Sequence, residues 1–257
     1  MVSHTFLVQN QFYATQRHRT GAQDNVRAGT ELVAREVRTT LEGGVIVAGP
    51  RTLTVRSPLA VTVVCNRVGL PNLDVFNEGG EGALALEEFA GVAARDPVTG
   101  SWEAANVPWS DVHSNAPGSA GGCADNGADT VGVSSSFHRL RGFESHLSFA
   151  PDEGDVVVLF RETTFSLGPS ALDPSTYGLF RAAYGDSLAE FATGIDTTAS
   201  FQYRISSGSY VDTVSAAALG TVDAVRVVAR ARKPPATGGT EDITFGWSVN
   251  IPIRAAR

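Results

Sequence analysis

Lysine is almost absent from this chain. Lys233 is the only one, and the 20 Lys and Arg residues are outnumbered by 27 Asp and Glu residues, which gives a formal net charge of -7. Apart from Arg226, Arg230, Arg232 and Lys233 in one expected strand, the basic residues are scattered. Binding to nucleic-acid phosphates depends on clustered Lys and Arg side chains that release counterions. We therefore predict no nucleic-acid partner.

Cysteine is also scarce. The two cysteines, Cys65 and Cys123, are widely spaced, and a structural zinc site would require four close ligands. In an oxidising compartment, a disulfide between them would close a loop of about 58 residues and stabilise the fold by about 4 kcal/mol. In a reducing compartment both would be buried thiols. The sequence leaves these two alternatives open.

Long apolar runs and enzyme motifs are missing too. No stretch of about 18 apolar residues occurs, and Met1–Asn10 has neither the charged nor the apolar part of a signal peptide. The chain contains no G-x-S-x-G elbow, P-loop, H-E-x-x-H or C-x-x-C motif. We therefore predict that the protein is not an enzyme and binds no cofactor. Asp125, Asn126 and Asp129 form an oxygen-rich segment that makes calcium a candidate, although the EF-hand register is absent.

Glycine and proline are abundant, with 27 and 12 residues, and favour many turns between strands. Short β-like segments after residue 44 are separated by Pro50 and Pro58. From 66 to 151 turn clusters dominate, and this part is expected to be a loop-rich elaboration with one short helix at 84–94. Within it, Trp102 and Trp109 could form an exposed aromatic platform that contacts sugar or protein.

The C-terminal region carries the clearest strand patterns. Apolar and polar residues alternate over 225–232 and again over 243–254. Such alternation is typical of strands with one face in the core and the other in solvent. We expect these two strands to pair antiparallel.

The N-terminal region predicts a helix. No proline occurs from Ser3 to Glu42, and Gly43 and Gly44 could provide the left-handed end of the helix. Apolar or small residues recur at spacings of four and three and share one helical face: Val26, Thr30, Val33, Val37 and Leu41. We expect this face to pack on the rest of the protein.

A helix of about 40 residues would be about 60 Å long, which exceeds the width of a compact domain of this size. Its first half is rich in Gln, Asn and Arg, and its few large apolar residues include Phe6, Phe12 and Tyr13. This half is expected to be an exposed stem. The helix-packing candidates are therefore Phe6, Phe12, Tyr13, Val26, Val33 and Val37.

Two stretches of the sequence carry a family resemblance. The first has an N-R-A-x-x-L-x-x-x-L/V-R motif after a polar stretch, matched by Asn25, Arg27, Ala28, Leu32, Val33, Arg35, Glu36 and Arg38. The second contains Leu188, Ala189, Gly194, Ile195, Phe201, Tyr203, Arg204, Tyr210, Val211, Asp212, Leu219, Val222, Ala224, Val225, Arg226 and Val227. Together these stretches cover roughly half of the chain, and they resemble the N-terminal helix and last strands of W-type minor pilins of type IV pili and J-type pseudopilins of type II secretion systems.

The resemblance implies an α+β fold in which a long N-terminal α-helix packs on an antiparallel β-sheet. The expected organisation is a helix at 1–44 and a β-rich head at 45–257. It also implies a structural subunit that assembles with other pilins or pseudopilins in the periplasm or at the cell surface. The family's leader, cleavage site and membrane-spanning half-helix, which anchor it in the inner membrane, have no counterpart in this sequence. The alternative is a secreted β-rich binding module or adhesin.

Overall fold

The computed structural model describes much of the chain. The described residues are 20–21, 23–67, 73–76, 89–107, 112–114, 137–140, 147–206, 208–233 and 243–253. They contain one α-helix at 20–38, in which residue 22 is not described, and one 3-10 helix, η5 (Ala216–Thr221). Strands make up most of the remainder.

Fourteen strands of the described residues are hydrogen-bonded into one antiparallel sheet. They are β1 (Val45–Ala48), β2 (Thr52–Arg67), β3 (Leu73–Phe76), β4 (Gly91–Arg95), β5 (Trp102–Asn106), β6 (Val112–Ser114), β7 (Phe137–Leu140), β8 (Val156–Pro169), β9 (Tyr177–Ala183), β10 (Ala189–Ile195), β11 (Ser200–Ile205), β12 (Tyr210–Val211), β13 (Val222–Lys233) and β14 (Ile243–Pro252). The pairing path is β12-β11-β13-β10-β9-β8-β2-β3-β7-β6, and β1, β4, β5 and β14 attach to its sides.

The predicted fold class, a long helix packed on an antiparallel sheet, is wrong. The protein is mostly antiparallel β, and its longest strands, β2 and β8, contain 16 and 14 residues. β2 continues through Pro58, where we expected a strand to end. Proline adopts an extended backbone readily and removes only one ladder donor, so it does not have to end a strand.

The helix predicted at 84–94 is also wrong where the structure describes it. Residues 91–94 belong to β4, which pairs with β5 on one side and β8 on the other. Val92, Ala93 and Ala94 are all buried. A short apolar run buried on both faces has no alternation, so periodicity cannot distinguish such a strand from a helix.

By its internal contacts, the chain divides into two units. Unit 1 consists of residues 1–55 and 163–257, and unit 2 of residues 56–162. The chain passes from one unit to the other inside β2 and again inside β8. Each unit has its own cluster of buried apolar residues.

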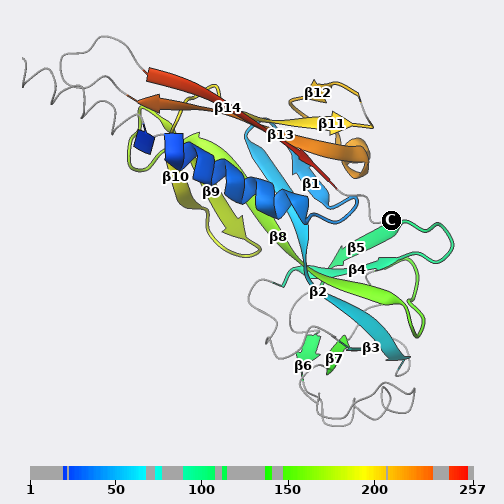
Figure 1. Ribbon diagram of the computed structural model, residues 1–257. Helices are drawn as coiled ribbons and strands as arrows, with labels where there is room; N and C mark the ends of the chain where they lie inside the picture. Colours follow the sequence, from blue (N-terminus) through cyan, green and yellow to red (C-terminus); the bar gives the residue numbers. More distant parts are fainter. Residues whose placement is uncertain are drawn as a thin grey trace, which may run out of the picture. The chain divides into compact units, whose positions relative to one another are not determined.

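In unit 1, the helix lies across the strands β9 and β10 (Figure 1). Val26, Val33 and Val37 are buried in a core shared with β9, β11 and β13. The helix ends at residue 38, earlier than predicted, because the Thr39 N–H and hydroxyl both turn back to the Glu36 carbonyl oxygen.

The antiparallel pairing predicted for the two C-terminal strands is confirmed. β13 and β14 pair over ten consecutive positions, from Ala224 with Pro252 to Lys233 with Ile243, without a register shift. On the other side of β13, β11 pairs from Ser200 to Ile205.

Unit 2 has a group of polar contacts centred on Arg56, in addition to its cluster of buried apolar residues. The Arg56 Nε donates to Glu162 Oε1 at 3.0 Å, and Nη2 donates to Asn106 Oδ1 at 2.7 Å. The guanidinium lies 4.9 Å from the centre of the Phe160 ring. These contacts join β2, β5 and β8, so part of the region expected to be loop-rich is an ordered set of strands.

No helix among the described residues is both long and apolar enough to cross a membrane.

Candidate functional site

Half of the predicted packing residues fall on the helix at 20–38. Val26, Val33 and Val37 are buried inside unit 1. Phe6, Phe12 and Tyr13 lie outside the described residues. Because the three valines are already enclosed by their own unit, substitutions there test the packing of the helix on the sheet. Their role in a filament stays a prediction.

Polar contacts fix both ends of the helix to the strands beneath it. Near its start, Asn25 Nδ2 donates to the Thr193 carbonyl oxygen of β10 at 3.0 Å. Near its end, Arg181 Nε of β9 donates to Glu36 Oε1 at 2.9 Å, in an ion pair whose Glu36 side chain is 8% exposed. Between these contacts Gly29 faces β10, and a Cβ added there would lie 2.7 Å from the Cβ of Ala192. The helix therefore has one position on the sheet.

The opposite face of the helix is charged and exposed. Arg27, Glu31, Arg35 and Arg38 all lie on it. Arg27 Nε donates to Glu31 Oε1 at 2.8 Å one turn away. That hydrogen bond raises the pKa of Arg27 above its ordinary value. Exposed pairs of this kind contribute little to stability.

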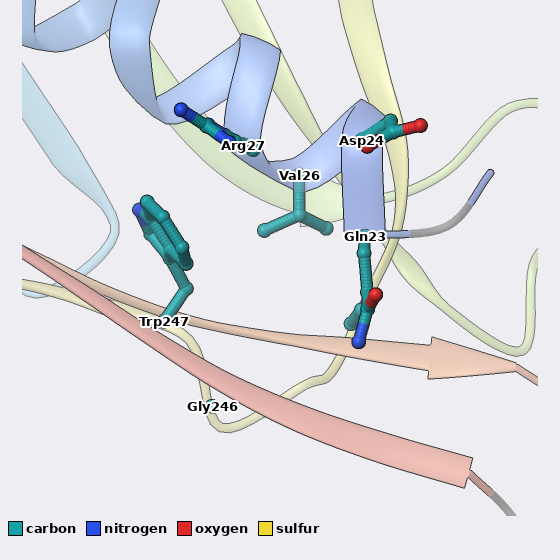
Figure 2. A pocket seen from close by; sticks show the side chains of 7 residues that line it. Gln23, Asp24, Val26, Arg27, Gly246 and Trp247 are labelled. Carbon is teal, nitrogen blue, oxygen red and sulfur yellow. The ribbon is translucent and has the colours of Figure 1, made fainter. Parts of the chain in front are cut away.

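A pocket of about 280 Å³ opens where the start of the helix meets β13 and β14. It is lined by Gln23, Asp24, Val26, Arg27, Ala231, Gly246 and Trp247. Figure 2 shows the Trp247 ring rising from its strand toward Val26 and the Arg27 guanidinium. The guanidinium lies 5.7 Å from the ring centre.

The pocket has the chemistry of a binding surface. Its lining offers an aromatic face, an aliphatic side chain, a cation, an amide and a carboxylate. The volume is slightly below the usual range for small-molecule sites, about 300–1,000 Å³. An apolar or aromatic side chain from another protein would fit this combination of size and chemistry.

The tryptophan platform is only partly described. Trp102 lies on β5, half-buried, in register with Arg95 of β4. Trp109 lies outside the described residues, so its position relative to Trp102 stays untested.

The remaining candidate residues also fall mostly outside the described part. Cys65 belongs to β2, but its side chain is not described, and Cys123 is not described at all. Asp125, Asn126 and Asp129, the calcium candidates, likewise lie outside. Over the described ranges, no three His, Cys, Asp or Glu side chains gather as a metal site would require.

Sequence reasoning missed the importance of Trp247. Alternation along 243–254 indicated a core-facing side chain, yet Trp247 is 40% exposed. It stands directly opposite Ala229 of β13, on the strand at the side of the pairing path. The sequence signal that could have identified Trp247 is that its segment, 243–254, is the last of the alternating segments.

Comparison of the chain with protein families, with curated proteins and with solved structures finds no match.

Proposed function

We propose that the protein is a structural minor subunit of a type IV pilus or a type II secretion pseudopilus, and that it acts in filament assembly or initiation. The observation that carries this proposal is the chemistry of the resembling residues. Asn25 and Glu36, both within the N-terminal motif, make the polar contacts that hold the helix on β9 and β10. These two motif residues thus hold the helix at 20–38 on strands of unit 1.

The C-terminal motif has a matching role in the head. Phe201, Tyr203, Val225 and Val227 are all buried where β11 pairs with β13. Arg204 Nε of the same motif donates to Asp223 Oδ1 at 2.7 Å. The residues of both motifs therefore support one unit, in which the helix is fixed to a sheet.

A fixed helix suits a filament subunit for a mechanical reason. A force on the N-terminal segment is transmitted to the strands of unit 1 only if the helix cannot slide on the sheet. The exposed face with Arg27, Glu31, Arg35 and Arg38 carries both signs of charge, and neighbouring helices could pair with it. In this proposal the partners are other pilins or pseudopilins. The protein acts in the periplasm or at the cell surface after insertion in the inner membrane.

Charge reversal on the exposed helix face tests the proposal. In a strain that lacks the gene, the native gene should restore filaments, and Arg35→Glu should restore fewer of them while its purified protein melts at the wild-type temperature. Leu172→Asp, at a side chain that is 80% exposed, is the matched control and should restore filaments fully. Normal filaments in the deletion strain would reject the proposal. Sequencing the DNA upstream of Met1 gives a second check, since a basic leader, a Gly-Phe type cleavage site and about 20 apolar residues are expected.

A secreted binding module is the second candidate, because the protein is dominated by antiparallel strands and Trp102 is only half-buried. This function predicts an ordinary secretory leader upstream. It also predicts binding to sugar or protein that Trp102→Ala reduces, while filaments form normally without the gene. The two candidates therefore predict opposite results for the deletion strain. Filaments are lost if the protein is a filament subunit, and they form normally if it is a secreted binding module.

A further inference from the structure

The last strand, β14, has one partner in the part of the chain that the structure describes. It pairs with β13 over its whole length, and Figure 1 shows the two strands running side by side. The other strands that have a single partner among the described residues are short: β12 has 2 residues, β6 has 3, β1 has 4 and β5 has 5. β14 has 10. Short edge strands offer little template for another chain, whereas a long one offers a complete ladder.

The backbone of β14 shows which groups are free for such a ladder. The Ile253 N–H donates to the Asp223 carbonyl oxygen at 2.9 Å, and the register of the two strands, continued by one residue, sets these residues opposite each other. In an antiparallel pair, hydrogen-bonded and non-hydrogen-bonded positions alternate. Trp247, Val249 and Ile251 therefore direct their peptide groups toward β13. Gly246, Ser248 and Asn250 direct theirs away from it.

Pro252 supports this assignment independently. It is an even-numbered position, so its nitrogen also points away from β13. Proline has no N–H to donate, and within sheets it is found on edge strands where that nitrogen faces away from the partner strand. Pro252 therefore removes no hydrogen bond from the β13–β14 ladder. Because it has no N–H to offer a further strand, the free edge of β14 is limited to the residues before it.

The edge also lacks the features that usually prevent strand pairing. From Ile243 to Ile253 there is no charged side chain. The pairing with β13 has no bulge. Gly246, Trp247, Ser248 and Asn250 are exposed. Natural edge strands are normally protected by charges, bulges or short length, and β14 has none of these.

We propose that β14 pairs antiparallel with β14 of a second copy of the chain, about a two-fold axis at Ser248. In this register Ser248 faces Ser248 of the second copy, and Gly246 faces Asn250, so every outward N–H of these three residues meets a carbonyl oxygen. On one face Trp247 lies beside Val249 of the second copy, and on the other face only neutral side chains meet. This pairing places Pro252 toward the margin of the interface.

An edge without charged residues suits a second copy. In a symmetric pairing each residue near the axis meets its own kind, so any charge on the edge would face a like charge. The arginines beside the edge already have partners within the chain. Arg226 Nε on β13 donates to Asn250 Oδ1 at 2.7 Å, and Arg27, 5.7 Å from the centre of the Trp247 ring, is paired with Glu31. This inference does not depend on the filament proposal.

The test is the association state of the purified 257-residue chain. Analytical ultracentrifugation at concentrations up to about 100 μM, which detects weak dimers, should show a dimer for the wild type and for Ser248→Ala. Ser248→Pro removes an outward donor without touching the β13 ladder. It should raise the dimer Kd by at least about tenfold, because two central hydrogen bonds are lost, while the melting temperature stays near that of the wild type. A monomeric wild type, or a Ser248→Pro variant that associates like the wild type, would overturn the proposal.

Charge variants keep the test decisive if the proline variant does not fold. Ser248→Lys and Ser248→Asp should each be monomeric, because the two-fold axis sets like charges opposite one another. An equimolar mixture of the two should form a heterodimer that dissociates as salt is raised. Dimers of either variant alone, or no association in the mixture while the wild type is dimeric, would show that the contact lies elsewhere on the surface.

Discussion

Replacing Tyr203 by Phe tests how unit 1 is held together. The Tyr203 side chain is fully buried on β11, and its hydroxyl donates to the Gly49 carbonyl oxygen at 2.8 Å, with the Thr52 carbonyl oxygen 3.1 Å away. The Thr52 oxygen also accepts the Gly49 N–H, so it keeps a donor in the variant. The Gly49 oxygen loses the hydroxyl. A buried acceptor that loses its donor costs about 1–3 kcal/mol, and this contact is part-buried, so we expect a loss in the lower part of that range, about 1.5 kcal/mol of the free energy of unfolding at neutral pH.

The same hydroxyl makes stability depend on alkaline pH. Burial raises the pKa of Tyr203 well above its ordinary value of 10.0, because the charged phenolate would be desolvated. The unfolded chain gives up this proton as the pH passes about 10, whereas the folded protein keeps it. The contribution to stability is therefore complete below pH 10 and decreases above it, by about 1.4 kcal/mol per pH unit for one proton. Tyr203→Phe lacks this proton, so its stability should decline less steeply and approach the wild-type value above pH 10.

Urea unfolding, followed by circular dichroism from about pH 7 to pH 11, measures both effects. Tyr210→Phe is the matched control. Its ring lies half-buried, 3.6 Å from the Arg226 guanidinium carbon, and phenylalanine keeps that ring in place. The control should change stability by less than about 0.5 kcal/mol. If Tyr203→Phe had no larger effect than the control at neutral pH, or declined with pH as steeply as the wild type, the hydroxyl would not hold Gly49 as described.

Two further changes test how the helix sits on the sheet. Gly29→Ala should destabilise the protein by about 1–3 kcal/mol in thermal unfolding because its Cβ would collide with the facing alanine of β10. Gly21→Ala, whose Cβ would meet nothing within 4 Å, should be neutral or stabilising by up to about 1 kcal/mol, and equal effects at the two glycines would contradict the close approach. Arg181→Gln should cost about 2 kcal/mol in urea unfolding, because it removes the Arg181 charge from the mostly buried Glu36 carboxylate, whereas Arg38→Gln at an exposed position should cost less than about 0.5 kcal/mol. Similar losses in these two variants would show that the ion pair does not anchor the helix.

Patterns over a few neighbouring residues identify the helix at 20–38 and the two C-terminal strands. The spacing of Val26, Val33 and Val37 indicates one side of a helix, and the structure buries those residues in unit 1. Alternation at the C-terminus predicted two strands, and β13 and β14 pair antiparallel as expected. Both patterns arise because a helix or a strand places every few residues on one face, which a short window of sequence reveals.

Local patterns misled where burial removed the alternation. The apolar residues of β4 are buried on both faces of the strand, so the segment shows no alternation and resembles a helix. Pro58 suggested a boundary, yet β2 continues through it. The sequence patterns therefore predict too few strand residues, and they lead to a fold class based on the helix instead of the sheet. Cysteine pairing, the calcium loop and the exposed stem fall on parts that the structure does not describe.

The sequence alone determined which faces of the helix and of the C-terminal strands are apolar, because that property depends on residues a few positions apart. Only the tertiary structure decided what those faces meet. Glu36 and Arg181, separated by 145 positions, form the ion pair that fixes the helix, and no spacing rule relates them. In the same way, the residues of β14 predict a strand, but only the order of the strands leaves its outer side without a partner among the described residues. Strand order depends on contacts between distant segments, and these form only when the whole chain folds.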